Sequence, residues 1–373
     1  FQAEDGIRDS STSRGLGHGH VYFGTQDNYV VALDAATGKE VWRTHVEDAQ
    51  AFGCRINSAP LVAGDLVVVG STGGDAAHRG HLVAFDGATG KMRWRFNVIP
   101  GPGEKGNETW EGDSWKLGGG APWLTGSYDP DLNLIYWGTG NASSDFFGDI
   151  RKGDNLYTAS IVALRPATGE VAWHFQTVPH DVWDYDAAYE CILVDLPVNG
   201  QPRKLLIHPS KSGYTFVLDR TNGAFVAGWR YVDTLTWSSG LDSKGVPIGR
   251  KEPVLNTPTI ICPNYYGGRS FNQASYSPKT GLLYNIGIEW CGEYIARNQE
   301  PAQGRSWMGG SIKLVPPPSG KVITHLDAFE PLTGKRIWRH EEKYPLLAAL
   351  VSTAGDLVFT GDVEGNFFAL NAK

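Results

Sequence analysis

One pattern of apolar and polar positions recurs along the chain. An apolar strand with alternating residues is followed by an acidic residue or a substitute, and then by x-x-T-G-x-x-x-W. Four close copies cover residues 30–42, 82–94, 161–173 and 326–338. Alternating apolar residues on both sides of a T-G turn predict a β-hairpin. Copies about 50 residues apart, with longer insertions between some of them, are typical of propeller blades.

Further segments fit the same repeat. A looser copy covers residues 215–229, and residues 367–373 lie inside another. Strand pairs at 127–140 and 275–285 supply inner strands for the hairpins. We therefore predict an all-β protein with five complete repeat signatures and part of a sixth. A set of unrelated hairpins is the alternative, and the four close copies disfavour it.

The tryptophans that end the close copies stand at one repeat position. They are Trp42, Trp94, Trp173 and Trp338. A large apolar side chain that returns once per repeat is expected to wedge neighbouring sheets together. We predict a packing role for these residues, not a catalytic one.

Composition and charge exclude several classes of partner. Gly 47, Pro 21 and Trp 13 among 373 residues suit short strands joined by tight turns. The net charge is −7 with no run of Lys or Arg, so neither a nucleic-acid partner nor a polybasic membrane patch is expected. Because no stretch approaches 18 apolar residues, no transmembrane segment is expected.

The four cysteines form no C-x-x-C pair and no zinc-like set with histidine, so we expect no structural metal cluster. Cys191 lies in the apolar run CILVDL and is predicted to be a small buried residue. Cys54 has no evident partner. A disulfide elsewhere would indicate an oxidising compartment.

The first residues fit no strand pattern. Residues 1–9 are polar and resemble a translated sequencing adapter, so we predict that residues 1–12 are a non-native or disordered tail. Residues 13–373 then form the domain.

The T-G-x-x-x-W repeat resembles the tryptophan-docking motif of methanol and ethanol dehydrogenases that depend on pyrroloquinoline quinone (PQQ). The resemblance runs over residues 13–373. It implies an eight-bladed β-propeller of the quinoprotein alcohol dehydrogenase type, truncated at both ends here, with about six blades present. The repeat alone is weakly specific, because non-catalytic propellers also carry it.

Segments that interrupt the repeat are more specific. GGGAPWLTGSYDP at 118–130 is similar to the family segment whose tryptophan forms the floor under the quinone, here Trp123. GTGNASSD follows, and Asn141 stands where the family has a metal-ligating asparagine. A flat aromatic cofactor needs a broad apolar surface for stacking, and a hard cation needs oxygen ligands. A core tryptophan and a turn asparagine are the structural alternatives.

Two later segments carry the predicted chemistry. HDVWDYDAAYE at 180–190 resembles the family's W-D-Y loop and puts Asp184 at the catalytic base and among the metal ligands. HPSKSGYTFVLDRTNG at 208–223 carries Lys211 where the family has a basic residue on the quinone carbonyls. A carboxylate beside a cation stays ionised and can accept the alcohol's proton, while Lys211 would stabilise charge on the reduced quinone. A loop aspartate in an Asx-turn and an exposed lysine are the alternatives.

Asp186 bears on the identity of the metal. An acidic residue at this position resembles the lanthanide-dependent branch of the family, whereas calcium enzymes usually have a small residue there. A trivalent hard ion favours one more anionic oxygen, so the resemblance favours a lanthanide over Ca²⁺. A solvated or salt-bridged Asp186 is the alternative.

The segment GSTGGDAAHRG at 70–80 departs from the family, which has a metal-ligating glutamate where this chain has Asp75. One methylene fewer shortens the reach by about 1.5 Å. We still expect Asp75 to be a metal ligand, with backbone capping as the alternative. Thr72, Gly73 and Gly74 are expected to contact the cofactor.

Other expected cofactor contacts follow from the resemblance. Arg14 matches an arginine that pairs with a PQQ carboxylate, and a surface arginine is the alternative. Asn57 replaces a small hydroxyl residue, and Ser270 with Phe271 replaces Asn-Trp or Asn-Gln. These changes indicate an altered pocket rim, so the substrate cannot be copied from relatives. Cys262 and Cys291 resemble a family disulfide.

The resemblance implies PQQ-dependent oxidation of a small alcohol to an aldehyde in the periplasm. Hydride would pass to metal-activated PQQ, with Ca²⁺ or a lanthanide as the metal, and electrons would pass to a cytochrome c. Two alternatives remain: a non-catalytic propeller scaffold of the outer-membrane assembly type, and a dehydrogenase for polymeric or bulky alcohols.

Overall fold

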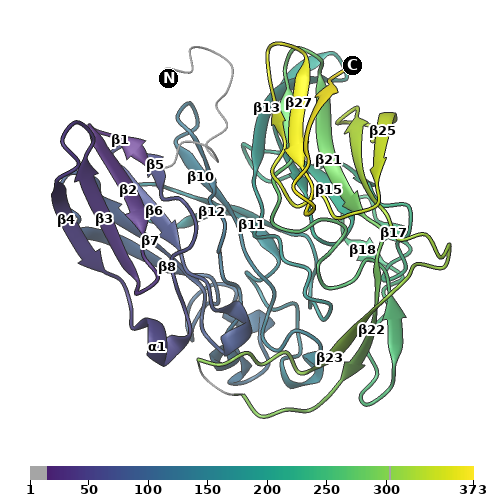
Figure 1. Cartoon of the computed structure of the whole chain (residues 1–373). Helices are drawn as coiled ribbons and strands as arrows, with labels where there is room; N and C mark the ends of the chain where they lie inside the picture. The colour runs from purple at the N-terminus through teal and green to yellow at the C-terminus, as the bar shows by residue number, and fades with distance from the viewer. Residues whose placement is uncertain (1–14, 302–303) are drawn as a thin grey trace. The chain divides into compact units, whose positions relative to one another are not determined.

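The computed structural model describes residues 15–301 and 304–373, and these residues form small antiparallel sheets joined by loops (Figure 1). The predicted tail and Arg14 lie outside the described residues. The contacts divide the described chain into two compact units. The N-terminal unit holds residues 15–191 and Ala296–Gly310, and the C-terminal unit holds Ile192–Ile295 and Ser311–Lys373.

Three four-stranded antiparallel sheets belong to the N-terminal unit, and each is ordered as its strands follow one another in the chain. The first sheet comprises β1 (Leu16–Gly17), β2 (His20–Gly24), β3 (Tyr29–Asp34) and β4 (Glu40–His45). The second comprises β5 (Leu61–Ala63), β6 (Leu66–Gly70), β7 (His81–Asp86) and β8 (Met92–Asn97). The third comprises β9 (Ser127–Asp129), β10 (Leu134–Gly138), β11 (Ser160–Leu164) and β12 (Val171–Gln176).

The C-terminal unit repeats the arrangement. Its first sheet comprises β13 (Ile192–Val198), β14 (Gln201–Pro209), β15 (Tyr214–Asp219) and β16 (Phe225–Arg230). Its second comprises β20 (Ser275–Ser277), β21 (Leu282–Ile288), β24 (Thr324–Phe329) and β25 (Arg336–Glu342). A three-stranded sheet follows, with β26 (Val351–Ser352), β27 (Leu357–Gly361) and β28 (Phe367–Asn371).

The remaining elements are short. Two further sheets comprise β17 (Gly240–Leu241) with β18 (Pro247–Ile248), and β19 (Thr259–Ile261) with β22 (Cys291–Ala296) and β23 (Gly310–Val315). The helical turns are α1 (Ala49–Phe52) and the 3-10 turns η1 (Gly74–Ala76), η2 (Asn107–Thr109), η3 (Ser114–Leu117) and η4 (Gly148–Ile150). Among the described residues, no helix has the length and apolar character needed to cross a membrane.

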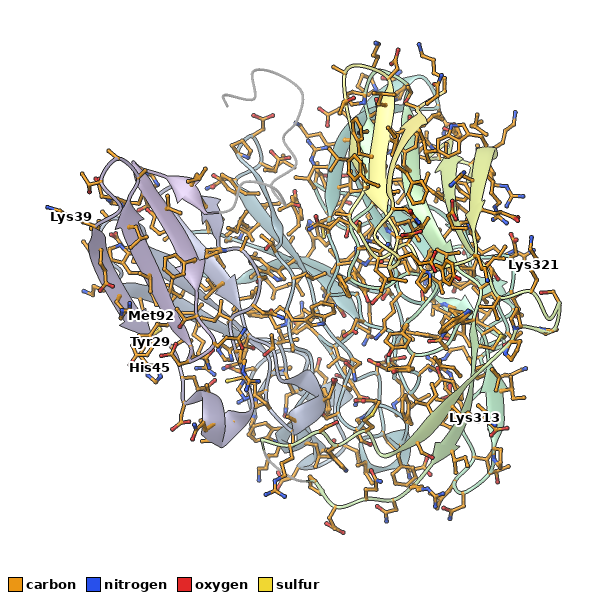
Figure 2. All side chains as sticks on the ribbon, viewed as in Figure 1. Tyr29, Lys39, His45, Met92, Lys313 and Lys321 are labelled. Carbon is orange, nitrogen blue, oxygen red and sulfur yellow. A yellow bond between two sulfur atoms is a disulfide. The ribbon has the colours of Figure 1, made fainter. Side chains whose placement is uncertain are left out.

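The acidic residue of the repeat closes its hairpin turn. In the turn between β3 and β4, Asp34 Oδ1 accepts from both Thr37 N and Thr37 Oγ1 at 2.7 Å. Asp86 and Thr89 repeat this pair of bonds between β7 and β8, at 3.0 and 2.8 Å. The turn fixes the register, so that at the far end of the first hairpin Tyr29 and His45 lie side by side, with ring centroids 4.8 Å apart (Figure 2).

The repeated tryptophan docks on the following sheet. Trp42 Nε1 donates to Gly87 O at 2.9 Å, and Trp94 Nε1 donates to Pro166 O at 2.7 Å. The glycine of the next T-G turn lies against each indole: a Cβ on Gly90 would come within 2.6 Å of Trp42. The predicted packing role is therefore confirmed, and the T-G glycine is required because the tryptophan leaves no room for a side chain.

The same docking occurs in the C-terminal unit, where Trp229 Nε1 donates to Pro331 O at 3.0 Å and Trp338 Nε1 donates to Ala372 O at 3.3 Å. Trp173 is buried with its ring 5.6 Å from that of Tyr136.

The larger hydrophobic cores lie between consecutive sheets. In β6, Val67 and Val69 point into a core shared with the first sheet, while Val68 points into a core shared with the third sheet. Leu283 of β21 packs toward β14 and β15, whereas its neighbour Tyr284 packs toward β27. Because strand side chains alternate between faces, each inner strand is buried on both faces, as expected of stacked blades.

Two predictions about cysteine are borne out. Cys262 and Cys291 form a disulfide, with Cα atoms 4.3 Å apart. Cys191 is buried, and burial raises the pKa of its thiol.

Candidate active site

The glycine run at 118–120 brings one predicted site segment against another within the N-terminal unit. Gly119 N donates to His78 O at 2.8 Å, and Gly80 N donates to Gly119 O at 2.9 Å. All three glycines of the run have positive φ, at 91°, 104° and 72°. Only glycine adopts such a run without strain, so this sequence is what lets the segment before Trp123 lie along residues 74–80.

The same run also lies against the segment that carries Asn141. Gly120 N donates to Asn141 O at 2.6 Å, and Gly140 N donates to Ala121 O at 3.0 Å. A Cβ on Gly140 would lie only 2.8 Å from Asp186 Oδ1, so glycine at this position lets the W-D-Y loop approach. Three segments that are distant in sequence thus meet.

The Asn141 side chain is held in one orientation. Its Nδ2 donates to Asp145 Oδ1 at 2.8 Å, and its backbone N donates to Asp186 Oδ1 at 3.0 Å. Its Oδ1 faces Gly74, lying 4.0 Å from where a Cβ on Gly74 would be. Because the amide nitrogen is engaged by Asp145, the oxygen is the atom that Asn141 can offer to a cation.

The W-D-Y loop is organised by an aspartate that the sequence analysis did not single out. Asp181 Oδ1 accepts from Trp183 N at 3.2 Å, and Asp181 Oδ2 accepts from Tyr185 N at 2.8 Å. Between them, Asp184 is buried and has φ 63°. A non-glycine residue in the left-handed region is strained, and such strain is typical of functional sites.

A buried arginine joins this loop to the segment after Asn141. The guanidinium of Arg151 donates to Ser144 O at 2.8 Å, to Asn155 Oδ1 at 2.9 Å and to Asp181 O at 2.5 Å. Arg151 was also missed, because an arginine in a polar loop gives no sequence signal of burial. Its contacts fix how the Asn141 and Asp184 segments lie relative to each other.

Trp123 is half-buried and meets Tyr189 edge to face, with ring centroids 5.9 Å apart and planes at 75°. Tyr189 is buried, so this contact steadies the indole. A half-buried, steadied indole is suited to stacking against a flat ligand.

The remaining predicted residues of the N-terminal unit are Asn57, Thr72, Gly73 and Asp75. Asp75 is exposed within η1, and its carbonyl accepts from Trp307 N at 2.7 Å. Thr72 Oγ1 accepts from Arg55 N at 2.8 Å, and Gly73 packs closely against Gly53. Asn57 is exposed. The structure brings Asn141, Asp186 and Gly74 together, and the roles of all these residues stay predictions.

Two predicted cofactor contacts, Lys211 and Ser270, lie in the C-terminal unit. Lys211 is buried, and its carbonyl accepts from Gly268 N at 2.9 Å. Ser270, two residues further along that loop, donates from its backbone N to Asn272 Oδ1 at 3.1 Å. The loops that carry Lys211 and Ser270 are therefore neighbours within this unit.

Comparison with protein families gives one match. Residues 43–230 match the model described as "PQQ: Glucose/ethanol/alcohol dehydrogenase, beta-propeller domain".

Proteins similar to this chain are named as alcohol or methanol dehydrogenases. The chain is 35% identical to quinoprotein alcohol dehydrogenase PedH of Pseudomonas putida, covering 95% of this chain and 63% of PedH. It is 34% identical to the lanthanide-dependent methanol dehydrogenase of Methylacidiphilum fumariolicum, covering 97% of this chain and 63% of that protein. Among solved structures, a europium-containing methanol dehydrogenase matches 96% of this chain and 66% of its own, with a TM-score of 0.91 and 34% identity. The chain thus spans less than two thirds of these relatives.

Proposed function

The chain belongs to the glucose/ethanol/alcohol dehydrogenase family of PQQ β-propellers, and from this premise we propose that it forms the catalytic propeller of a PQQ-dependent alcohol dehydrogenase. Membership confirms the predicted all-β propeller fold. The number of blades stays a prediction.

One observation carries the proposal: Asn141 is fixed with its amide nitrogen on Asp145 and its backbone nitrogen on Asp186, so that its oxygen faces Gly74. The donor atoms in this region are amide and carboxylate oxygens, which suit a hard cation. Trp123 on the adjoining segment supplies a half-buried aromatic surface. The residues present therefore fit both a metal ion and a flat quinone.

In the proposed mechanism, Asn141, Asp184, Asp186 and Asp75 hold the metal, and Trp123 supports PQQ. When bound, PQQ accepts two electrons and the metal supplies Lewis acidity. Asp184 accepts the hydroxyl proton of the alcohol on a carboxylate oxygen as the C–H bond breaks. The bonds from Asp181 to the flanking backbone hold Asp184 for this transfer.

The cofactor contacts proposed for Thr72, Gly73, Gly74 and Asn57 follow the family pattern, as do those of Lys211, Ser270 and Arg14. This part of the proposal rests on sequence positions.

We further propose that the metal is a lanthanide. Asp186 adds an anionic oxygen to the ligand set, and a trivalent ion gains more from an added charge than Ca²⁺ does. A relative that covers 97% of this chain is named lanthanide-dependent.

The substrate and the acceptor are proposed at the level of class: a small alcohol, with electrons passing to a cytochrome c. The periplasm is the proposed location, because the Cys262–Cys291 disulfide fits an oxidising compartment.

A dye-reduction assay tests this function. The protein is supplied with PQQ and an alcohol, and with either Ca²⁺ or La³⁺, and PQQ binding is followed separately by fluorescence. We expect turnover that is faster with La³⁺. Asp184→Asn should lower kcat by about 10²–10⁴-fold, as for loss of a general base. Asp113→Asn, on an exposed turn, is the matched control and should leave kcat unchanged.

Two results would contradict the proposal. No turnover with either metal, with PQQ unbound, would favour the non-catalytic scaffold. Full activity of Asp184→Asn would show that another group is the base.

A further inference from the structure

A second group of candidate ligands lies in the N-terminal unit, formed by Glu47, Cys54 and His78. Their ligand atoms all lie within 4.8 Å of one another. Cys54 Sγ is 3.8 Å from Glu47 Oε2, and His78 Nε2 is 3.5 Å from the same oxygen. No linear motif predicted this group, because its members are separated in sequence and meet only in the fold.

Local structure explains how Glu47 and Cys54 come to face the same point. They flank α1, whose N-terminus is capped by Asp48 Oδ1 accepting from Gln50 N and Ala51 N at 2.9 Å. Gly53, with φ 65°, ends the helix in the left-handed conformation. This single capped turn reverses the chain and places the carboxylate and the thiol on the same side.

The imidazole of His78 provides an independent indication of a ligand. The side chain is 4% exposed, and its Nε2 has no hydrogen-bond partner among the described residues. An unsatisfied buried polar atom costs about 1–3 kcal/mol. A neutral imidazole whose other nitrogen carries the proton can present its Nε2 lone pair to a cation. His78 Nε2 lies 3.5 Å from Glu47 Oε2, and the ligand atoms of His78, Cys54 and Glu47 are all within 4.8 Å of one another.

The distances match a tetrahedral ion. Zinc lies about 2.3 Å from sulfur and about 2.0–2.2 Å from nitrogen or oxygen, so tetrahedral nitrogen–oxygen pairs are roughly 3.3–3.6 Å apart and sulfur–oxygen pairs roughly 3.5–3.7 Å apart. The nitrogen–oxygen separation of 3.5 Å lies in its range, and the sulfur–oxygen separation of 3.8 Å, at which the thiol donates to the carboxylate in the absence of an ion, is close to its range. Direct hydrogen bonds would be shorter for the nitrogen–oxygen pair.

His81 is the nearest candidate for the fourth position. Its Nε2 is 3.7 Å from Glu47 Oε2, and its Nδ1 is 3.3 Å from Arg79 O. A guanidinium can only donate, so a hydrogen bond from Arg95 Nη2 to His81 Nδ1 would leave the ring proton on Nε2. His81 can bind a metal through Nε2 only in the other tautomer, in which Nδ1 donates to Arg79 O. Arg95 Nη2 lies 3.1 Å from His81 Nδ1 and 3.3 Å from Glu47 Oε1, so the arginine contacts one carboxylate oxygen while the other faces the thiol and the imidazoles.

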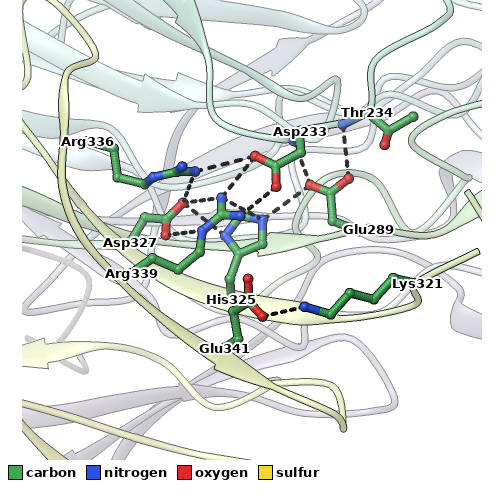
Figure 3. A network of polar contacts seen from close by, with 9 residues as sticks. All are labelled: Asp233, Thr234, Glu289, Lys321, His325, Asp327, Arg336, Arg339 and Glu341. Atoms are coloured by element: carbon green, nitrogen blue, oxygen red, sulfur yellow. Dashed lines mark hydrogen bonds and ion pairs between the residues drawn. The ribbon is translucent and has the colours of Figure 1, made fainter. Parts of the chain in front are cut away.

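The C-terminal unit contains a geometrically similar group that carries no such inference. Asp233, Glu289 and His325 also have ligand atoms within 4.8 Å of one another. Figure 3 shows that Arg339 reaches into this group, with Nη1 2.5 Å from Asp233 Oδ2. A guanidinium already occupies the place of a cation there.

We propose that Glu47, Cys54 and His78, with His81 at the fourth position, bind a divalent transition-metal ion of the Zn²⁺ type. Thiolate and imidazole ligands select such an ion over Ca²⁺ or a lanthanide, so this site differs in chemistry from the oxygen ligands around Asn141. The ion would join the α1 turn to the loop of residues 74–80. It would therefore stabilise the segment that carries Asp75 without taking part in the reaction.

Cobalt binding tests the proposal directly. Co²⁺ is added to folded protein with the Cys262–Cys291 disulfide intact, in excess Ca²⁺, which occupies oxygen-ligand sites. We expect a thiolate-to-cobalt charge-transfer absorption with one Co²⁺ per chain, displaced by Zn²⁺. Cys54→Ser should abolish the absorption, and His78→Gln should weaken cobalt binding by at least about tenfold.

Cys191→Ser is the matched control, because it removes the other buried free thiol and should leave the absorption unchanged. Circular dichroism establishes that each variant is folded. If Cys54→Ser does not fold, His78→Gln carries the test. Absence of the absorption in the folded wild type, its survival in Cys54→Ser, or unchanged affinity in folded His78→Gln would overturn the proposal. None of these readouts depends on dehydrogenase activity.

Discussion

Two buried clusters of histidine and carboxylate, one in each unit, show how similar residues can serve different purposes. In the C-terminal unit, His325 lies between Asp327 and Glu289, with Nδ1 2.9 Å from Asp327 Oδ2 and Nε2 3.2 Å from Glu289 Oε1. Arg339 Nε donates to Asp327 Oδ1 at 2.7 Å (Figure 3). Glu289 also accepts from the backbone N of Asp233 at 2.7 Å. The guanidinium of Arg339 thus provides positive charge beside the carboxylates of this cluster.

The cluster of the N-terminal unit contains a thiol, to which Asn28 Nδ2 donates at 3.1 Å. Arg95 contacts Glu47, but His78 Nε2 has no hydrogen-bond partner among the described residues. Proximity of histidine and carboxylate is common to both clusters and so does not identify a metal site. Two features distinguish them. His325 Nε2 is hydrogen-bonded to Glu289 whereas His78 Nε2 has no hydrogen-bond partner among the described residues, and Arg339 pairs with both Asp327 and Asp233 in the C-terminal cluster.

We call the C-terminal cluster of His325, Asp327, Glu289 and Arg339 the closed cluster, because its charged groups pair with one another. Removing one charge from it should have the largest effect on stability. Asp327→Ala leaves His325 and Arg339 buried without their shared partner, so the free energy of unfolding should fall by about 3–5 kcal/mol. Urea denaturation measures this. Asp113→Ala, on an exposed turn, should cause no measurable change. A loss below about 1 kcal/mol for Asp327→Ala would mean that the cluster is not closed in solution.

Zinc should stabilise only the other cluster. With free Zn²⁺ at about 100 times its Kd, the free energy of unfolding should rise by about 2.7 kcal/mol in the wild type. Cys54→Ser should remove this gain, whereas His325→Gln should retain it. Differential scanning calorimetry with and without Zn²⁺ distinguishes the two clusters. If Zn²⁺ failed to stabilise both Cys54→Ser and His325→Gln, the two clusters could not be told apart by zinc binding.

The closed cluster should also depend on pH. Burial alone would lower the pKa of His325, but its bonds to Asp327 and Glu289 outweigh burial and raise that pKa. Burial would raise the pKa of Asp327, but Arg339 and His325 outweigh burial and lower it. Burial would also raise the pKa of Asp233, but its bonds to Arg339 outweigh burial and lower that pKa.

A raised histidine pKa contributes stability below about pH 6.5, which is lost as the pH rises through the folded-state value. A lowered aspartate pKa contributes stability above about pH 3.9, which is lost as the pH falls through the folded-state value. The cluster should therefore stabilise most between about pH 4 and 6.5. The melting temperature of the wild type, minus that of His325→Gln, should be largest in this window. A difference that grows above pH 8 would contradict the assignment.

The smallest effect is expected at the edge of the closed cluster. Lys321 Nζ lies 2.5 Å from Glu341 Oε2, but both side chains are exposed and solvent screens the pair (Figure 3). Lys321→Ala should change the free energy of unfolding by less than about 0.5 kcal/mol. Urea denaturation measures this as well. A larger loss of stability would mean that the exposed Lys321–Glu341 pair contributes to the closed cluster.

The sequence could predict those parts of the fold that depend on residues close together in the chain. Hairpins follow from alternation and the T-G turn, and the packing of Trp42 and Trp94 follows from their return at one repeat position. The division into two units was not predicted, because it depends on contacts between residues far apart in the chain.

Sequence motifs predicted which residues belong to the candidate site, but they did not predict the contacts that hold those residues in place. Trp123, Asn141 and Asp184 were picked out by resemblance to family motifs. Arg151 and Tyr189 were missed because burial of a single side chain in a loop leaves no periodic signal. The Cys54–His78 contact was missed for a related reason: the spacing rules for metal ligands describe short linear motifs, and here a helical turn and a distant loop bring the ligands together.

The docked tryptophans constrain how this protein can be made. Trp42 completes its bond 45 residues later along the chain, Trp94 72 residues later and Trp229 102 residues later. The next sheet must therefore form before the indole of the last one is covered. Until then each hairpin presents an uncovered aromatic edge, which makes the partly folded chain prone to aggregate.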